Sequence, residues 1–206
     1  MRIGPIVRPA PAMVLLVGTL LAGTLCWSLV GKAGTPEGAS AIGAEVDRSP
    51  ISLALSADSK RLLTANQTSG SVSWIDNSAG RVLQELRTGD KPAGVALARD
   101  GKRAVVTHWY GYDVAILEID GDSLKIADRV EIGPEPRGVV ISPDGKTAYV
   151  TVGVSNEVVR LDLDSRKITG RLTVGREPRG IALNPDGSTL VVGNARSPHL
   201  SVIDIG

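Results

Sequence analysis

Two histidines are the first candidates for acid–base or metal chemistry, because their ordinary pKa lies near neutrality. His108 follows an expected strand and precedes an aromatic stretch, whereas His199 lies near the C-terminus in Ser197-Pro198-His199. Neither has a cysteine or a group of carboxylates at the spacing that metal sites use. The sequence also lacks a Gly-x-Ser-x-Gly nucleophile motif. We therefore expect no catalytic residues, no metal and no cofactor.

A binding surface is better supported than catalysis by a short aromatic stretch. Trp109, Tyr110 and Tyr112 are half of the six aromatic residues and follow His108 directly. Large amphipathic rings on a loop are typical binding anchors, because they offer contact area at a low entropic cost. The alternative is that these rings pack over the end of the strands. We include His108 with them as a candidate binding residue.

Two arginines could bind an anion. Arg137 and Arg179 each stand between a proline and a glycine, at the entry to an expected strand. A guanidinium group matches the planar, two-pronged geometry of a carboxylate. The alternative is that each arginine pairs with a nearby glutamate, Glu135 or Glu177.

The composition favours an all-β protein. Hydrophobic residues make up 42 % and charged residues 22 % of the 206 residues, as in folded proteins. With no Phe, the core must come from Val, Ile, Leu and Ala. The 24 Gly and 12 Pro indicate many turns between short strands. The single cysteine, Cys26, excludes an internal disulfide and any multi-cysteine metal site.

The first part of the chain differs in charge from the rest. Arg2, Arg8 and Lys32 lie in a stretch of 32 residues that contains no acidic residue. The remainder carries 20 basic and 22 acidic side chains. Such a body has no basic face for nucleic acid, so we expect no nucleic-acid partner.

Residues 13–30 form an uncharged apolar run that predicts export or anchoring. As a helix these 18 residues would span about 27 Å, close to the hydrocarbon thickness of a bilayer. Arg2 and Arg8 precede the run, which predicts a cytoplasmic N-terminus and an extracytoplasmic body. Residues 1–31 are therefore expected to be a signal anchor or transmembrane helix, and residues 32–48 a flexible linker. The alternative is cleavage near Ala39-Ser40-Ala41 and secretion.

A repeat of about 42 residues dominates the rest of the chain. Four prolines recur at spacings of 42, 44 and 42 residues, and each is followed eight residues later by an aspartate. A second aspartate closes each copy. These markers are Pro50, Pro92, Pro136 and Pro178, then Asp58, Asp100, Asp144 and Asp186, then Asp76, Asp120, Asp162 and Asp204. An aspartate that recurs in every copy is better explained as a turn residue than as a catalyst.

Each copy predicts four short antiparallel strands, which is the content of one propeller blade. In the third copy an apolar run, residues 138–141, ends in Ser142-Pro143-Asp144-Gly145, and Ala148-Tyr149-Val150-Thr151 follows. This unit and the similar fourth copy resemble the YVTN β-propeller repeat of the WD-repeat-like superfamily, as found in YncE-like proteins, over residues 49–206. The resemblance implies an exported, non-catalytic propeller with blades at residues 49–90, 91–134, 135–176 and 177–206. It also implies that Arg137 and Arg179 enter innermost strands near a central channel.

Four blades are fewer than the resemblance implies, and the fourth copy supplies only three strands. Residues 41–46 align with an outer strand and could close the ring by pairing with the fourth copy. Three arrangements follow: a truncated open arc, a closed four-bladed ring, or two chains that complete one ring.

The sequence thus predicts a membrane-anchored, extracytoplasmic β-propeller that acts as a non-catalytic binding or assembly scaffold. Its expected partners are proteins in the periplasm or at the membrane, with self-association as a further option. The alternative is a propeller component of a periplasmic haem or quinone oxidoreductase, since such propellers often occur beside these modules.

Overall fold

The computed structural model describes residues 47–206, which lie in the compact unit Ala44–Gly206. All the regular structure of this part is β-strand, so the predicted all-β class is confirmed. None of its residues belongs to a helix long and apolar enough to span a membrane. The expected anchor at residues 1–31 and the closing strand at residues 41–46 lie outside the described residues, as does most of the linker.

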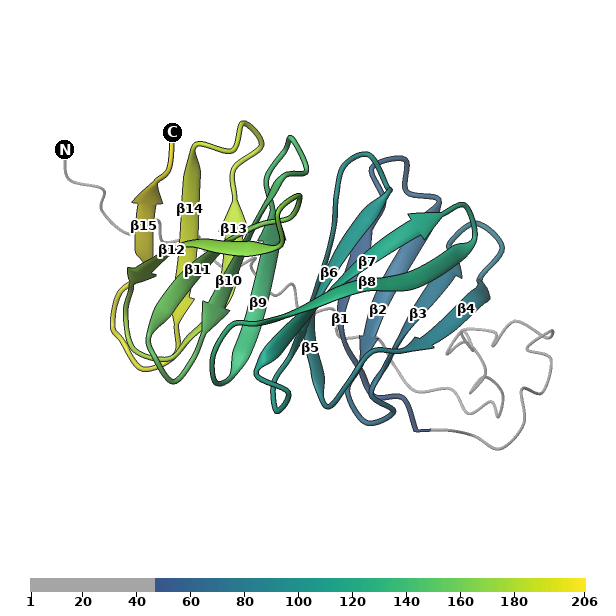
Figure 1. The fold of residues 1–206 in the computed structure, drawn as a ribbon, viewed down its shortest axis with the longest axis horizontal. Coiled ribbons are helices and arrows are strands. Elements are labelled where there is room, and N and C mark those ends of the chain that lie inside the picture. The colour runs from purple at the N-terminus through teal and green to yellow at the C-terminus, as the bar shows by residue number, and fades with distance from the viewer. Residues whose placement is uncertain (1–46) are drawn as a thin grey trace, which may run out of the picture. The chain divides into compact units, whose positions relative to one another are not determined.

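Four antiparallel sheets account for the described strands (Figure 1). The first contains β1 (Pro50–Leu55), β2 (Arg61–Asn66), β3 (Ser71–Asp76) and β4 (Arg81–Arg87). The second contains β5 (Pro92–Leu97), β6 (Arg103–His108), β7 (Asp113–Asp120) and β8 (Ser123–Glu131). The third contains β9 (Pro136–Ile141), β10 (Thr147–Val152), β11 (Glu157–Asp162) and β12 (Lys167–Thr173). The fourth contains β13 (Pro178–Leu183), β14 (Thr189–Asn194) and β15 (Ser201–Asp204).

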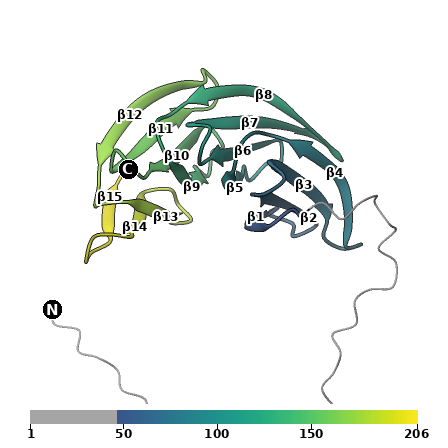
Figure 2. The same ribbon diagram turned by 90° about the horizontal axis from the view of Figure 1, so that it is seen from below.

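The sheets stack in chain order, as the blades of a propeller do. β5 lies against β1 and β9, and β9 lies against β13. Figure 2 shows these first strands on the inner side of an arc and β4, β8 and β12 on its outer side. In this part of the chain the arc is open, because the first and fourth sheets stand at its two ends.

The hydrophobic core lies between the sheets. One cluster joins the first and second sheets, another joins the second and third, and another joins the third and fourth. Because successive side chains of a strand point to opposite faces of the sheet, each position faces either the preceding or the following sheet. Val95, Val139 and Ile181, three residues after the repeat proline, face the preceding sheet, and the next residue of each strand faces the other way. Each fully buried Val or Leu contributes about 1.5–3 kcal/mol, so stacking supplies most of the stability.

Inner strands of neighbouring sheets approach so closely that a glycine is required. A Cβ on Gly94 or Gly138 would lie 2.3 Å from a backbone oxygen of the next sheet, that of Arg137 or Arg179 respectively. The same two carbonyls accept hydrogen bonds from the second strands of the preceding sheets. The Thr107 hydroxyl donates to the Arg137 oxygen over 2.7 Å, and the Thr151 hydroxyl donates to the Arg179 oxygen over 3.1 Å.

The recurring aspartates hold the tight turns, as the sequence predicts. Asp58 and Asp144 each accept a hydrogen bond from a serine hydroxyl two residues earlier and from a backbone N–H two residues later. The serine hydrogen bond is the main cause that lowers the pKa of each carboxyl. These carboxylates therefore serve the turns and are not available to a substrate.

The close approach of the inner strands makes a testable prediction. Gly138→Ala should lower the melting temperature by about 2–12 °C, because a forced contact in a packed interior costs roughly 1–3 kcal/mol and shifts a domain of this size by ~2–4 °C per kcal/mol. Gly170→Ala on β12 is the matched control, since the only atom within 4 Å of a Cβ built on Gly170 is Arg160 Cβ at 3.9 Å, an ordinary van der Waals distance. Thermal melts followed by circular dichroism measure both variants. Equal losses would contradict the argument.

Candidate functional site

The antiparallel sheets have two different ends. We call the end with the loops between second and third strands, and between successive sheets, the loop end. The opposite end, with the tight turns after first and third strands, is the turn end. His108 and the aromatic stretch belong to the loop end, as do Arg137 and Arg179 at the starts of β9 and β13.

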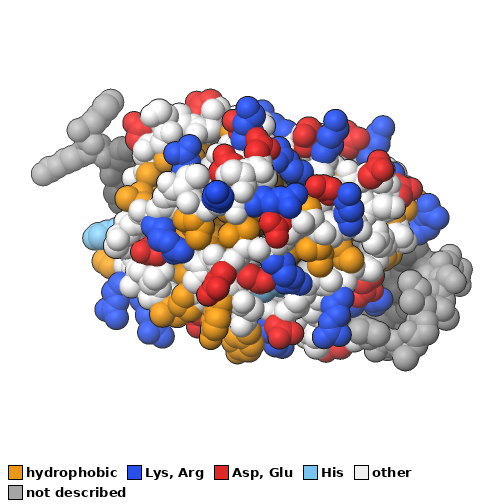
Figure 3. All heavy atoms as spheres, in the orientation of Figure 1, with side chains coloured by type: hydrophobic (Ala, Val, Ile, Leu, Met, Phe, Trp, Pro, Cys, Tyr) orange, Lys and Arg blue, Asp and Glu red, His pale blue; other side chains and the backbone are white. Residues whose placement is uncertain are grey.

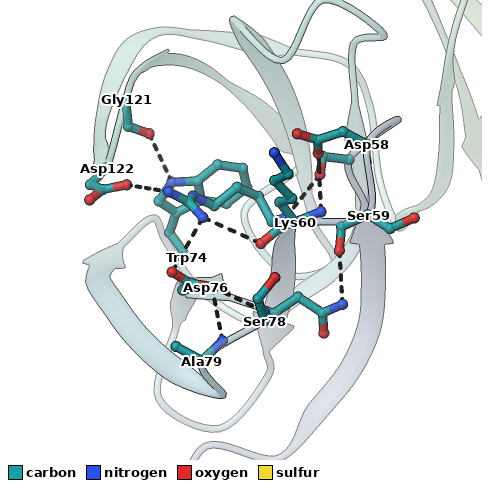
Figure 4. Close-up of polar contacts among 12 residues, drawn as sticks. Asp58, Ser59, Lys60, Trp74, Asp76, Ser78, Ala79, Gly121 and Asp122 are labelled. Carbon is teal, nitrogen blue, oxygen red and sulfur yellow. Dashed lines mark hydrogen bonds and ion pairs between the residues drawn. The ribbon is translucent and has the colours of Figure 1, made fainter.

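A hollow of about 670 Å³ lies at the turn end, between the first and second sheets. Some of the polar groups in and beside it bond to one another (Figure 4). The Trp74 indole donates to the Gly121 carbonyl over 3.2 Å, and Arg61 contacts Asp76 at 3.5 Å and Asp122 at 2.8 Å. Lys60, Lys102 and Asp120 also line the hollow, and their side chains form no ion pair within residues 47–206, so its charged groups are only partly paired.

The aromatic loop lies at the loop end, between β6 and β7. Its backbone is tied down where the Trp109 N–H donates to the Lys91 carbonyl over 2.9 Å and where Tyr112 takes a left-handed φ of 59°. Trp109 is half-buried, whereas Tyr110 and Tyr112 are 59 % and 52 % exposed. The two tyrosines are therefore open to a partner, and the tryptophan packs beneath them.

The structure brings together two residues that the sequence predicted separately. The Arg137 guanidinium carbon lies 3.9 Å from the centroid of the Trp109 ring, which is a cation–π contact between the second and third sheets. The Tyr110 ring lies 5.0 Å from the Trp109 ring and is tilted by 40°. Aromatic and cationic surface thus adjoin at the loop end.

Both predicted arginines pair with the neighbouring glutamates, which is the alternative that the sequence left open. Arg137 Nη2 lies 3.4 Å from Glu135 Oε2, and Arg179 Nε lies 3.0 Å from Glu177 Oε1. Arg137 keeps a buried Nε atom without a hydrogen-bond partner in the described part of the chain. That atom and the unpartnered Trp109 Nε1 are both buried, so a bound group would meet the exposed part of the Arg137 side chain, which is 19 % exposed as a whole.

Arg137 also lines a hollow of about 340 Å³ between the third and fourth sheets, which we call the arginine hollow. Its lining residues are Glu135, Arg137, Gly153, Val154, Asn156, Arg176, Glu177 and Arg196. Arg179 bonds to Glu177, which lines the hollow, but Arg179 itself does not line it.

The charges of the arginine hollow favour an anion. Glu177 contacts Arg196 at 2.6 Å and also bonds to Arg179, and the Arg179 hydrogen bond is the main cause that lowers the Glu177 pKa. Arg176 forms no ion pair with any residue in 47–206. Three arginines and two glutamates therefore line the hollow, and the excess is positive.

Sequence reasoning missed Arg176, Arg196 and Asn156. Arg176 lies in a loop between sheets, and the other two lie in loops between second and third strands. The repeat places all such loops at the same end as Arg137, so the signal was present. The sequence alone does not show which of these loops lie side by side.

His108 is a buried residue that stabilises the fold, and not the surface binding residue that the sequence suggested. Its side chain is fully buried, and Nδ1 lies 2.8 Å from Asp113 Oδ1. Arg129 Nη1 contacts Asp113 Oδ2 at 2.9 Å and also donates to the Thr88 carbonyl of the first sheet. Burial raises the Asp113 pKa, but the hydrogen bonds from His108 and Arg129 outweigh it and lower that pKa below its ordinary value.

Metal chemistry finds no support among residues 47–206, where no three His, Cys, Asp or Glu side chains are grouped as metal ligands. His199 is exposed and belongs to no such group within residues 47–206. Acidic and basic side chains are interspersed over the face drawn in Figure 3. That face offers no continuous basic surface of the kind nucleic acid requires.

Comparisons with known proteins agree with this fold. The family model of YncE-like β-propellers matches residues 26–206. The comparison with curated proteins gave no match. A structure of Kuenenia stuttgartiensis hydrazine synthase is 27 % identical with a TM-score of 0.70, and the match covers 81 % of this chain and 49 % of that chain.

Two further structures show likeness in fold alone. A protein of unknown function from Desulfotomaculum acetoxidans is 17 % identical with a TM-score of 0.70, and the match covers 79 % of this chain and 54 % of that one. A candidate 6-phosphogluconolactonase from Bacteroides uniformis is 16 % identical with a TM-score of 0.67, with coverages of 76 % and 50 %. The chain thus spans about half the length of these solved structures.

The different burial of the aromatic residues makes a second prediction. Trp109→Ser should lower the melting temperature by about 4–8 °C, because losing the half-buried ring and its cation–π contact costs roughly 2 kcal/mol. Tyr110→Ser, the matched control, should stay within about 2 °C of the wild type, as exposed substitutions do. A melt in which Tyr110→Ser is the more damaging change would show that the loop is packed differently.

Proposed function

Because the chain belongs to the YncE-like β-propeller family, we propose that it is a membrane-anchored, extracytoplasmic and non-catalytic binding scaffold. We further propose that its partners bind at the loop end. The ligand would be a protein segment that presents a carboxylate next to an aromatic or aliphatic side chain.

One observation carries this proposal: the Arg137–Trp109 contact joins the exposed tyrosines to the arginine hollow. Arginine and aromatic side chains are the types enriched where protein interfaces concentrate their binding energy. Tyr110 and Tyr112 would cover the apolar part of the segment. Arg176 and the partly exposed guanidinium of Arg137 would donate to its carboxylate, and charge-assisted bonds of this kind are the stronger ones.

The environment of His108 supports a non-catalytic role. A general base must come within hydrogen-bond reach of the proton it abstracts. The Nε2 atom of His108 is buried, and a Cβ built on Gly89 would lie 3.2 Å from it. A substrate at the surface could not reach that nitrogen without opening the contact between the first and second sheets.

The alternative function, a component of a periplasmic haem or quinone oxidoreductase, is favoured by the likeness to hydrazine synthase, which is an enzyme. His108 does not fit haem ligation, because the crowding at Gly89 that excludes a substrate from its Nε2 atom excludes a haem iron as well. In this alternative the chain would be a docking subunit. A haem absorbance band that co-purifies with the chain from its native membrane would favour it.

Ligand binding can be tested with a defined probe. Fluorescence anisotropy of a labelled hexaglutamate peptide, added to the full chain in detergent, should show binding that weakens as salt is raised. Replacing Arg176 and Arg196 with Gln should weaken binding at least about ten-fold, which is ~1.4 kcal/mol.

Arg81→Gln is the control, because Arg81 is an exposed arginine on β4 of the first sheet, away from the arginine hollow. Hexalysine should not bind. Equal affinity of the double variant and the wild type for hexaglutamate would refute the proposed site.

Membrane anchoring rests on the apolar run at residues 13–30 and is tested separately. The protein should pellet with membranes and resist carbonate extraction, because an 18-residue apolar segment is long enough to span the bilayer. A soluble periplasmic form with a mature N-terminus near Ile42 would show instead that the segment is a cleaved signal.

A further inference from the structure

The first sheet exposes positions that form the core elsewhere in the repeat. Leu53 occupies the position of Val95 and Val139, three residues after the repeat proline. Those two valines are 6 % and 7 % exposed because the preceding sheet covers them, whereas Leu53 is 68 % exposed. Ile51 and Leu55 on the same strand are 49 % and 48 % exposed.

This exposed face is continuous across the sheet. The strand register aligns Leu55 with Leu62, Leu62 with Ile75 and Ile75 with Val82. The row therefore crosses all four strands with apolar side chains. We call the face formed by Ile51, Leu53, Leu55, Leu62, Ile75 and Val82 the first end face.

The fourth sheet shows the complementary situation. Val202 pairs with Val191 as Trp74 pairs with Leu63, so Val202 occupies the position of Trp74. Trp74 is 2 % exposed beneath the second sheet, and Val202 is 68 % exposed. Leu200 matches Val158 by the same register and is 64 % exposed, against 4 % for Val158. With Ala182 and Val191 these residues form the last end face.

We propose that the first end face of one copy packs on the last end face of a second copy, and the reverse, to close a ring of eight sheets. Each end face occupies the place of a sheet face that is covered elsewhere in the molecule, and the first end face has Thr64 and Ser73 where the second sheet has the core residues Val106 and Ala115. A two-fold axis makes the two contacts equivalent and leaves no free end face. This inference concerns other surfaces than the proposed partner site.

The size of the assembly supports a second copy as the occupant. Propellers contain about four to eight blades, and two copies of this arc give eight. Soluble proteins seldom leave apolar faces of this extent open.

Gly180 adds an observation independent of exposure. Gly94 and Gly138, at the same repeat position, each lie against a carbonyl of the next sheet, whereas Gly180 has nothing within 4 Å of a built Cβ. In the first sheet, Ile51 stands at the repeat position that Arg137 and Arg179 occupy in the third and fourth sheets. In the proposed ring, Gly180 would lie against the Ile51 carbonyl of the second copy.

The first experiment measures mass and proximity on the full chain in detergent. Light scattering should give a protein mass of two chains. In a Cys26→Ser background, a copy with Leu53→Cys and a differently tagged copy with Ala182→Cys should cross-link with a short bis-maleimide. The corresponding pair inside the chain, Val139 and Ala96, shares one core cluster. Replacing Ala182→Cys by Val154→Cys, an exposed loop position, should abolish the cross-link.

The second experiment separates the end faces from the N-terminal segment as the cause of association. Leu53→Asp or Gly180→Ala should weaken dimerisation at least about ten-fold while the β-sheet circular dichroism persists, because both residues are open within one copy. Val154→Asp should leave the dimer intact. The proposal is overturned by a monomeric wild type, by a dimer that survives Leu53→Asp, by open oligomers of larger mass, or by a cross-link within one chain that carries both cysteines.

Discussion

The contact between neighbouring sheets is the constraint on which the rest of this molecule depends. No sheet has a core of its own, and the buried side chains lie in clusters between sheets. The inner strands set the spacing: a glycine allows the next strand to approach, and a threonine hydroxyl bonds to its carbonyl. Since this arrangement repeats, each sheet is stable only while its neighbours cover it, which is the behaviour of repeat proteins.

The same contact positions the candidate site. Arg137 takes part both in the contact between sheets and in the candidate site. Its backbone oxygen accepts a hydrogen bond from the Thr107 hydroxyl, and its side chain contacts Trp109 of the preceding sheet. The guanidinium is therefore held by two sheets at once, and the hollow beside it is bordered by loops of the third and fourth sheets. His108 contributes from behind, where its pairing with Asp113 and Arg129 fastens the aromatic loop to the first sheet. A partner would thus meet a surface whose polar groups are already oriented, which reduces the entropic cost of binding.

The fold could be predicted from sequence because its signals are periodic. Prolines, glycines and turn aspartates recur at a fixed spacing, and each has a local physical reason to stand where it does. The aromatic residues and Arg137 were also found, because they break the repeat or stand at strand entries. Their contact with each other was not predictable, since it joins loops of different sheets and depends on the spacing between those sheets. The role of His108 was missed for the same reason: its partner Asp113 also binds Arg129 from two strands away, and only the fold shows that the ring is buried.

Amide hydrogen exchange, read strand by strand by mass spectrometry, tests the dependence on stacking most directly. If stability resides between sheets, β6 and β10, which have a sheet on both sides, should exchange most slowly at every protein concentration. At concentrations where the chain is monomeric, β2 and β14, the equivalent strands of the two end sheets, should exchange much faster, and their protection should rise as concentration increases. Protection of β2 and β14 equal to that of β6 and β10 in the monomer would contradict the account, because each sheet would then be stable without a neighbour.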